Sequence, residues 1–196
     1  MSNSESKTQR TRAHILDVAW KLIAERGLDV GMSEIASEVG LTRQSVHLHF
    51  RTRGGLLIGL VRRADEREDI HARFLEALSN EDPHRRFEAF LRVWFDFASK
   101  IRPVASQLIA ARRSDAAADA AWSDRMNELR DGFLGLTTSL RRDGVLAQEW
   151  TAPSAADYLW AAVSIQSLEL LSVERGWGDA RTRKILRRVL AKGIFE

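Results

Sequence analysis

Hydrophobic residues recur every three or four positions along most of the chain, which is the spacing of one face of an α-helix. Alternation of hydrophobic and polar residues, which would indicate strands, is nearly absent, so the pattern predicts an all-α protein. The first predicted helix covers residues 9–26 and ends at Gly27, since glycine readily adopts the left-handed conformation common just after a helix. Its hydrophobic face consists of Ile15, Leu16, Ala19, Leu22 and Ile23.

Two short helices are predicted next, over residues 32–39 and 43–50, with a turn at Gly40 between them. A fourth helix is predicted to start near Gly54 and to run to about Leu78. Each of these three helices is preceded by a residue that favours the N-cap position. The expected N-caps are Gly31, Thr42 and Thr52.

The same periodicity continues to the C-terminus and predicts five further helices. Pro103 and the Gly-Trp-Gly sequence at residues 176–178 interrupt it. The predicted helices cover residues 83–100, 103–113, 117–142, 153–174 and 180–192. About nine helices are therefore expected in total.

The predicted helix at residues 43–50 has one buried and one outward face. Val46 and Phe50 are four residues apart and share a face, whereas Gln44 and Leu48 point nearly the opposite way. Two short helices joined by a tight turn form a helix-turn-helix, whose second helix enters the major groove of DNA. Residues 32–50 therefore predict a DNA-binding element.

His47 and His49 also raise the possibility of a metal site. Successive residues on a helix are about 100° apart, so these two imidazoles would point about 200° apart. A helical metal pair needs the i, i+4 spacing of H-E-x-x-H instead. We expect neither a metal site nor a cofactor.

Composition is that of an ordinary globular protein, with 196 residues, of which 44% are hydrophobic and 29% charged. The absence of cysteine excludes disulfides, thiolate metal sites and cysteine nucleophiles. The N-terminus has no secretory signal, and charged residues interrupt the long apolar stretch at 155–174, so a buried helix is expected there and no membrane span. These features favour a cytoplasmic protein.

Basic residues cluster in two places, although the net charge is only +3. The clusters are Lys7, Arg10 and Arg12 at the N-terminus, and Arg43, Arg51 and Arg53 around the predicted helix-turn-helix. Most such clusters are solvated surface charge, and the alternative is a surface that binds a polyanion.

Residues 12–57 resemble the DNA-binding region of the tetracycline-repressor (TetR) family of bacterial transcriptional regulators. The sequence ILDVAWKLIAERG resembles the first helix of the family, and EIASEVGLTRQSVHLHFRTRGGLL resembles its core. The resemblance implies an N-terminal arm and helix-turn-helix domain, residues 1–53. A helical domain for effector binding and dimerisation, residues 54–196, would follow.

The sequence departs from the family pattern at several positions. His47 stands where the family usually has a tyrosine and Arg53 where it usually has a lysine, and both of those family residues contact DNA phosphates. Histidine and arginine can still donate to phosphate. Gly31 stands where family members often have a threonine, and family members often have an acidic residue near the position of Gly54. The helix caps and the phosphate bond that those residues make in the family are therefore not carried over.

The resemblance implies that the outward face of the second short helix contacts DNA. Gln44 is expected to read an adenine, Leu48 to meet a thymine methyl group, and Ser45 to bond to a base or a phosphate. The residues expected to bind phosphates are Arg43, His47, His49 and Arg53. Alternatively, His49 packs against the first helix. The N-terminal basic cluster either forms an arm near the minor groove or is disordered.

The predicted helices at 83–100 and 153–174 are hydrophobic on nearly every side, which is typical of burial all round. A single core does not need two such helices, so the excess indicates an internal cavity, a subunit interface or both. The resemblance implies both, with the last two helices forming a dimer. Two-fold symmetry then requires a pseudo-palindromic operator.

An apolar or planar effector is expected among aromatic side chains with few polar anchors. The candidates are Trp94, Phe97, Trp122, Met126, Phe133, Trp160 and Gln166, with Gln107 and Asn127 as further anchors. Aromatic residues at helical spacing are also typical of a core, so a purely structural role stays open.

The sequence thus predicts a homodimeric repressor that binds double-stranded DNA and is released by a small apolar or aromatic effector. An enzyme is not expected, because no nucleophile elbow, Walker loop, dinucleotide fingerprint or H-E-x-x-H motif occurs. The alternative is an α-helical dimeric interaction protein without sequence-specific DNA binding, which would leave the pattern of Arg43, Gln44 and Arg53 unexplained.

Overall fold

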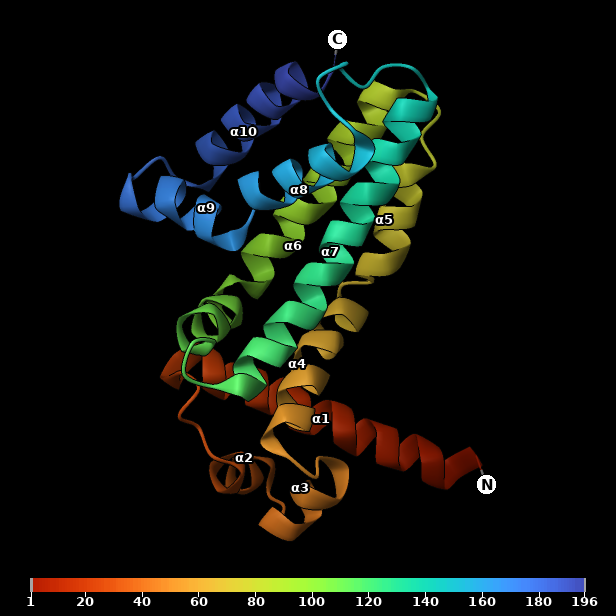
Figure 1. The fold of residues 1–196 in the computed structure, drawn as a ribbon. Coiled ribbons are helices and arrows are strands. Elements are labelled where there is room, and N and C mark those ends of the chain that lie inside the picture. The colour runs from red at the N-terminus through yellow and green to blue at the C-terminus, as the bar shows by residue number, and fades with distance from the viewer. Residues whose placement is uncertain (1, 196) are drawn as a thin grey trace. The chain divides into compact units, whose positions relative to one another are not determined.

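The computed structural model describes residues 2–195, with side chains from Lys7 onward, and confirms the all-α prediction. Within this range the chain forms ten α-helices and one π-helix (Figure 1). The N-terminal helices are α1 (Ser2–Arg26), α2 (Met32–Val39), α3 (Arg43–His49), α4 (Arg53–Arg67) and α5 (Ile70–Leu78). They are followed by α6 (Pro83–Ala111), α7 (Ala116–Arg142), α8 (Ala152–Ala162), α9 (Ile165–Glu169), the π-helix η1 (Leu170–Glu174) and α10 (Asp179–Ile194). No helix of the described residues is both long enough and apolar enough to cross a lipid bilayer.

The chain divides into two compact units. We call them the N-terminal unit (Met1–Glu68 and Ile101–Arg125) and the C-terminal unit (Asp69–Lys100 and Met126–Glu196). Helices α6 and α7 each contribute residues to both units. The predicted domain boundary after residue 53 differs from this division and stays a prediction.

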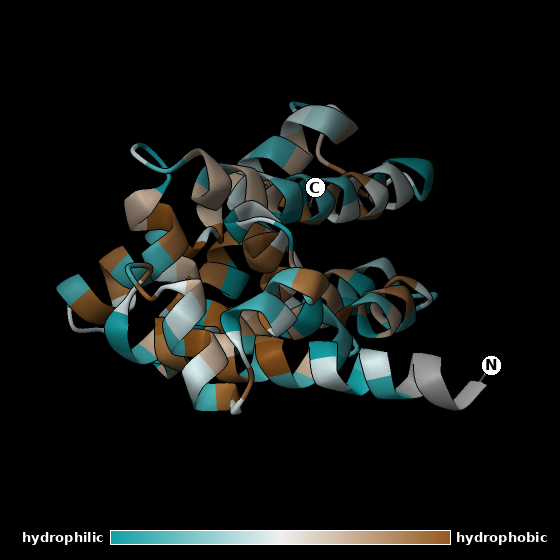
Figure 2. Ribbon diagram, turned by 90° about the horizontal axis from the view of Figure 1, so that it is seen from below, coloured by the Kyte–Doolittle hydropathy of each residue, from teal (hydrophilic) through white to brown (hydrophobic). Residues whose placement is uncertain are grey.

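In the N-terminal unit, α1 packs against α2 and α4, and α2 packs against α3. The whole predicted hydrophobic face of α1 is buried. It meets side chains buried on the other three helices, among them Ile35, Val46, Phe50 and Leu60. Hydrophobic residues thus lie on the sides of the helices that face one another, and polar residues cover the outside (Figure 2).

The predicted N-caps are confirmed. The hydroxyl of Thr42 accepts a hydrogen bond from the amide of Ser45 at 3.1 Å, and that of Thr52 accepts one from the amide of Gly55 at 3.0 Å. Gly31 precedes α2 and donates its amide to the Glu34 carboxylate at 2.9 Å. These bonds satisfy donors that the first turn of a helix cannot satisfy itself.

The single helix predicted from Gly54 to Leu78 is wrong, because the chain turns between α4 and α5. Asp69 has φ +48°, and it is the only residue other than glycine with a positive φ in the described part of the chain. The turn buries Ile70 and stacks Phe74 on Phe90 with ring centroids 4.4 Å apart. Hydrophobic spacing continues across the turn, so the sequence pattern does not reveal it.

The predicted break before Pro103 is also wrong, since α6 continues through this residue. Proline lacks the amide that would bond to the carbonyl four residues earlier, but Pro103 lies on the exposed side of the helix. Ala98, Ile101 and Val104 next to it are buried and keep the backbone in place.

The predicted helix 153–174 is divided into α8, α9 and η1. Ser164 starts α9 by accepting a hydrogen bond from the amide of Ser167 at 3.2 Å. The carbonyl of Val163 at the end of α8 accepts a hydrogen bond from the buried indole of Trp94 at 2.8 Å. A side chain from α6 therefore satisfies a carbonyl that the break exposes.

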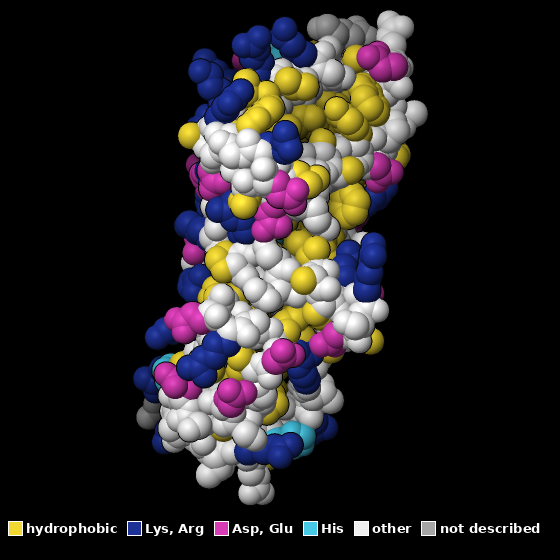
Figure 3. All heavy atoms as spheres, turned by 90° about the vertical axis from the view of Figure 1, so that its left-hand side faces the viewer, with side chains coloured by type: hydrophobic (Ala, Val, Ile, Leu, Met, Phe, Trp, Pro, Cys, Tyr) yellow, Lys and Arg dark blue, Asp and Glu magenta, His cyan; other side chains and the backbone are white. Residues whose placement is uncertain are grey.

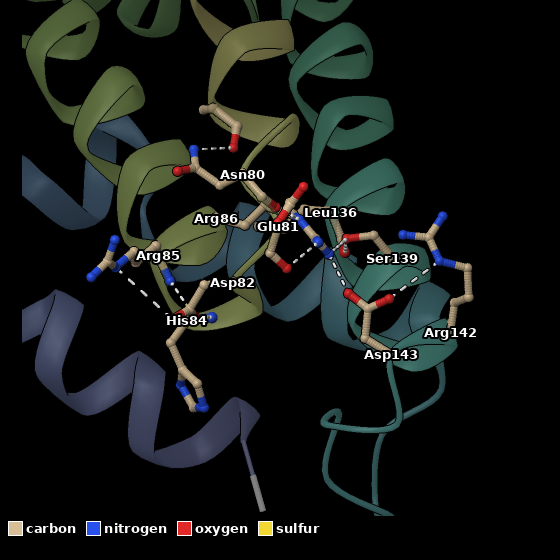
Figure 4. Close-up of polar contacts among 11 residues, drawn as sticks. Asn80, Glu81, Asp82, His84, Arg85, Arg86, Leu136, Ser139, Arg142 and Asp143 are labelled. Carbon is tan, nitrogen blue, oxygen red and sulfur yellow. Dashed lines mark hydrogen bonds and ion pairs between the residues drawn. The ribbon is translucent and has the colours of Figure 1, made fainter.

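A buried arginine joins three segments of the C-terminal unit (Figure 4). Arg86 is 4% exposed and donates to the carbonyls of Asn80 and Glu81, at 2.9 and 3.1 Å. It also donates to the hydroxyl of Ser139 at 2.9 Å and to the carboxylate of Asp143 at 2.5 Å. The turn before α6 is thereby fixed to the end of α7.

Candidate nucleic-acid interface

Helices α2 and α3 form the predicted helix-turn-helix at the end of the N-terminal unit. Gly40 ends α2 with φ +73°, and the amide of Leu41 donates to the carbonyl of Ala36 at 2.8 Å. Thr42 then starts α3 after only two residues. This tight turn needs the left-handed conformation that glycine adopts without strain.

The two faces of α3 are arranged as predicted. Val46 and Phe50 are buried in the unit, whereas Gln44 and Leu48 are exposed. Leu48 is 80% exposed, although contact of a leucine side chain with water is unfavourable. An outward leucine beside an outward amide suits a surface that meets base edges, where the thymine methyl group offers an apolar partner.

The remaining α3 residues flank this outward face. Arg43 and His47 are exposed, and Ser45 and His49 are half-buried. The hydroxyl of Ser45 lies 2.9 Å from that of Thr42, so it already contributes to the helix start. All six residues predicted to contact DNA from α3 thus lie on one short helix and are at least partly open to solvent.

Arg53 is bound within the protein. Its Nη2 donates to the carbonyl of Leu28 at 2.6 Å, and its Nη1 donates to the carboxylate of Asp115. Asp115 also caps α7 by accepting hydrogen bonds from the amides of Ala117 and Ala118, at 2.9 and 3.2 Å. Arg53 therefore ties the loop after α1 to the starts of α4 and α7, and its predicted phosphate contact stays a prediction.

The surroundings of Asp115 favour its charged form. Partial burial acts to raise the pKa of this carboxyl, but the amide of Ala118 and the guanidinium of Arg53 outweigh it and hold the pKa below its ordinary value. The pair thus stays ionised at neutral pH.

The basic residues at the N-terminus lie within α1, which begins at Ser2, rather than in a disordered segment. Lys7 and Arg10 are exposed. Arg12 is exposed as well, and its guanidinium is directed to the end of α3. Its Nη1 donates to the carbonyl of His49 at 2.9 Å, and its Cζ lies 4.2 Å from the centroid of the Phe50 ring. A contact of His49 with the first helix is one of the two expectations for this residue, but residue spacing gives no sign of Arg12 as the partner, which is 37 positions away.

The candidate effector residues are not all in one unit. Trp94, Phe97, Met126 and Phe133 are buried in the C-terminal unit, with Trp160 half-buried beside them. The Trp160 indole donates to the carbonyl of Met126 at 3.0 Å. Two candidates differ from this group. Trp122 is buried in the N-terminal unit, and Gln166 is exposed. Of the further anchors, Gln107 belongs to the N-terminal unit and Asn127 is exposed.

Comparison with known proteins agrees with this geometry. The family model described as bacterial regulatory proteins, tetR family, matches residues 15–60. The HTH-type transcriptional repressor BepR of Brucella suis biovar 1 (strain 1330) is 29% identical over 187 residues, which cover 90% of this chain and 88% of BepR.

Solved structures share the fold over nearly the whole chain. A TetR-family transcriptional regulator from Agrobacterium tumefaciens has a TM-score of 0.73 at 23% identity and covers 96% of this chain and 100% of its own. A transcriptional regulator from Saccharomonospora viridis, solved in complex with choline, has a TM-score of 0.77 at 21% identity. The match covers 96% of this chain and 99% of the chain from S. viridis. Residues 15–60, which contain the helix-turn-helix, thus match the tetR family of bacterial regulatory proteins, and over most of its length the chain is similar to a transcriptional repressor.

Proposed function

We propose that this regulator is a dimeric repressor that binds a pseudo-palindromic operator through α3 of each subunit and is released by a small effector. The observation that carries the proposal is the outward face of α3. It presents Gln44 and the 80% exposed Leu48 on a helix held by buried Val46 and Phe50. An amide and an apolar side chain at this position can read adenine and thymine in the major groove.

Dimerisation is supported by the exposed hydrophobic residues of the C-terminal unit. Leu170 and Val173 on η1 and Val189 on α10 are more than half exposed, and these two helices pack together. Figure 3 shows hydrophobic side chains gathered near the C-terminal end of the chain, on a surface where charges of both signs otherwise alternate. A second copy would cover such a surface, and its two-fold axis would demand an inverted repeat in the DNA.

Release by an effector is proposed from the family and from the aromatic interior of the C-terminal unit. Two indole N–H groups, those of Trp94 and Trp160, are already bound to backbone carbonyls. The effector is therefore expected to be bound mainly through apolar contact. Binding would change the spacing of the two α3 helices in the dimer, which must match grooves about one helical turn apart.

The first experiment is selection of random duplex DNA by the purified protein at moderate salt, followed by sequencing. An inverted repeat with half-sites about one turn apart is the expected result. Enrichment of no sequence, together with binding that disappears as salt rises, would favour the alternative of a helical dimer without sequence-specific binding.

Gln44→Ala tests the assignment of the base reader. Loss of a bidentate contact to adenine should weaken binding to the selected duplex by about tenfold to a hundredfold and relax the preference at one base pair per half-site. Arg43→Gln is the matched comparison, because loss of a phosphate contact should weaken all sequences alike and reduce the salt slope by about one. Unchanged base preference in Gln44→Ala would assign the reading to another residue.

A further inference from the structure

Helix α3 is short, and its C-terminal end needs support from elsewhere in the unit. It has seven residues, and Phe50 leaves the helical conformation with φ −137°. In its last turn the carbonyl of Val46 accepts a hydrogen bond from the amide of Phe50 at 2.9 Å, but the carbonyls after it lie beyond the reach of helical donors and carry the negative end of the helix dipole. The hydrogen bond from the amide of Ser45 to the hydroxyl of Thr42 fixes the start of α3 but does not hold its C-terminal end.

Arg12 of α1 supplies this support through two different contacts. Its Nη1 donates to the carbonyl of His49, the last residue of α3, at 2.9 Å. Cζ of the same guanidinium lies over the ring of Phe50, 4.2 Å from the ring centroid. A cation at the C-terminus of a helix is favourable, and stacking on an aromatic ring adds to it.

Helix α4 leaves room for this arrangement at Gly59. A Cβ atom at this position would lie 3.0 Å from Cε1 of Phe50 and 3.4 Å from Nη2 of Arg12. It would also lie 3.3 Å from Cδ2 of Leu16. The end of α3, the N-terminal half of α1 and the middle of α4 therefore meet around the Arg12 guanidinium.

We infer that Arg12 is a positioning residue that sets the orientation of α3 and so determines how well the protein distinguishes its operator from other DNA. The inference rests on the proposed function, since it concerns the same interface. Arg12 acts through His49 and Phe50 rather than by touching DNA. Lysine cannot replace it, because an ammonium group has neither a flat face for the ring nor the fixed geometry of the guanidinium.

The test compares the wild-type protein with Arg12→Lys and Arg12→Gln on two duplexes. One is the duplex enriched by the wild-type protein, and the other is a scrambled duplex of the same length and composition. Dissociation constants are measured at several salt concentrations. Both variants should reduce the ratio of the two affinities by about tenfold. Arg12→Lys should keep the wild-type affinity for the scrambled duplex and the wild-type salt slope, because its charge is unchanged.

A phosphate contact predicts the opposite pattern. The inference is overturned if Arg12→Lys keeps the wild-type ratio, or if Arg12→Gln loses affinity equally for both duplexes with a salt slope lower by about one. Arg43→Gln shows what a phosphate-type loss looks like in the same assay. Failure of the wild-type protein to enrich any sequence would instead overturn the proposed function itself.

A second variant covers the case in which Arg12→Lys does not fold. Phe50→Leu keeps the core apolar but removes the ring beneath the guanidinium, and it should lower the affinity ratio in the same direction. In a double-mutant cycle with Arg12→Gln the two losses should be clearly less than additive, because both act on one contact. Full additivity would show that Arg12 does not act through Phe50 and would overturn the inference.

Discussion

At the scale of single residues, the most constrained side chain of the C-terminal unit is Arg86. Its guanidinium is almost fully buried, yet four acceptors surround it. Burial of a charge costs free energy unless the group is paired and hydrogen-bonded, and here both conditions hold. Arg85, the adjacent residue, has a side chain that is 82% exposed and lies 3.9 Å from Asp82.

Arg86→Ala should lower the free energy of unfolding by about 3 kcal/mol, because it removes a donor from the carbonyls of Asn80 and Glu81, from Ser139 and from Asp143. Arg85→Ala should change it by less than about 0.5 kcal/mol. Urea denaturation of the two variants and the wild type measures the difference. Equal effects of the two substitutions would show that the buried contacts do not stabilise the fold.

Asp143 makes stability depend on pH. The hydrogen bond from Arg86 is the main reason that the pKa of Asp143 lies below its ordinary value, and Arg142 adds to it. A carboxyl whose pKa is lowered by folding stabilises the protein above its unfolded pKa, which is about 3.9. This contribution is lost as the pH falls from there through the folded pKa.

The melting temperature should therefore fall below about pH 4, and Asp143→Asn should show a shallower fall in the same range. Asp131→Asn removes an exposed carboxylate within α7, the helix that ends just before Asp143, and serves as the control. Thermal unfolding followed between pH 6 and pH 2.5 checks this. If the melting temperature fell equally steeply with decreasing pH in Asp143→Asn and in the wild type, the prediction would be contradicted.

At the scale of helices, the starts were easier to predict from the sequence than the interruptions. Thr42 and Thr52 cap their helices through amides three residues away, so the signal is local. At the break after Val163, the exposed carbonyl is bound by Trp94, which is 69 positions distant. The turn at Asp69 likewise has no glycine or proline to mark it.

Trp94→Phe tests whether the break depends on the indole N–H. The substitution leaves the Val163 carbonyl without its donor in a buried place, so the free energy of unfolding should fall by about 2 kcal/mol. Trp160→Phe is the control, because its partner, the carbonyl of Met126, lies inside α7 and keeps a helical donor. Urea denaturation distinguishes them, and an equal or smaller loss for Trp94→Phe would rule out the indole as the stabilising group.

The candidate interface shows the same contrast between local and distant information. The two faces of α3 follow from the spacing of Val46, Leu48 and Phe50 within one helix. The partners of Arg12 and Arg53 could not be predicted from spacing, because they lie 37 and 62 positions away in the sequence. Periodicity identifies which side chains point outward. Only the folded structure shows which basic side chains are bound to other residues of the same protein.

At the scale of the whole molecule, the proposed dimer is the least local feature. Val173 on η1 is exposed and hydrophobic, and a glutamate there would place a charge inside the proposed interface. Val173→Glu should weaken the dimer by at least about tenfold. Leu75→Glu is the control, because Leu75 is equally exposed on α5, outside the proposed interface. Sedimentation at several protein concentrations measures both, and a wild-type dimer in Val173→Glu would place the interface elsewhere.

The buried tryptophans give the two units separate optical signals. Trp122 lies in the N-terminal unit and Trp94 in the C-terminal unit, and each is 2% exposed. An indole shielded from water emits at shorter wavelength than one in solvent, so exposure of either ring shifts its fluorescence to the red. The chain has six tryptophans, so variants that keep only Trp94 or only Trp122, with the other five replaced by phenylalanine, are needed for the emission to report the opening of one unit. Comparison of the two unfolding curves then shows whether the N-terminal unit and the C-terminal unit lose their structure in one cooperative transition.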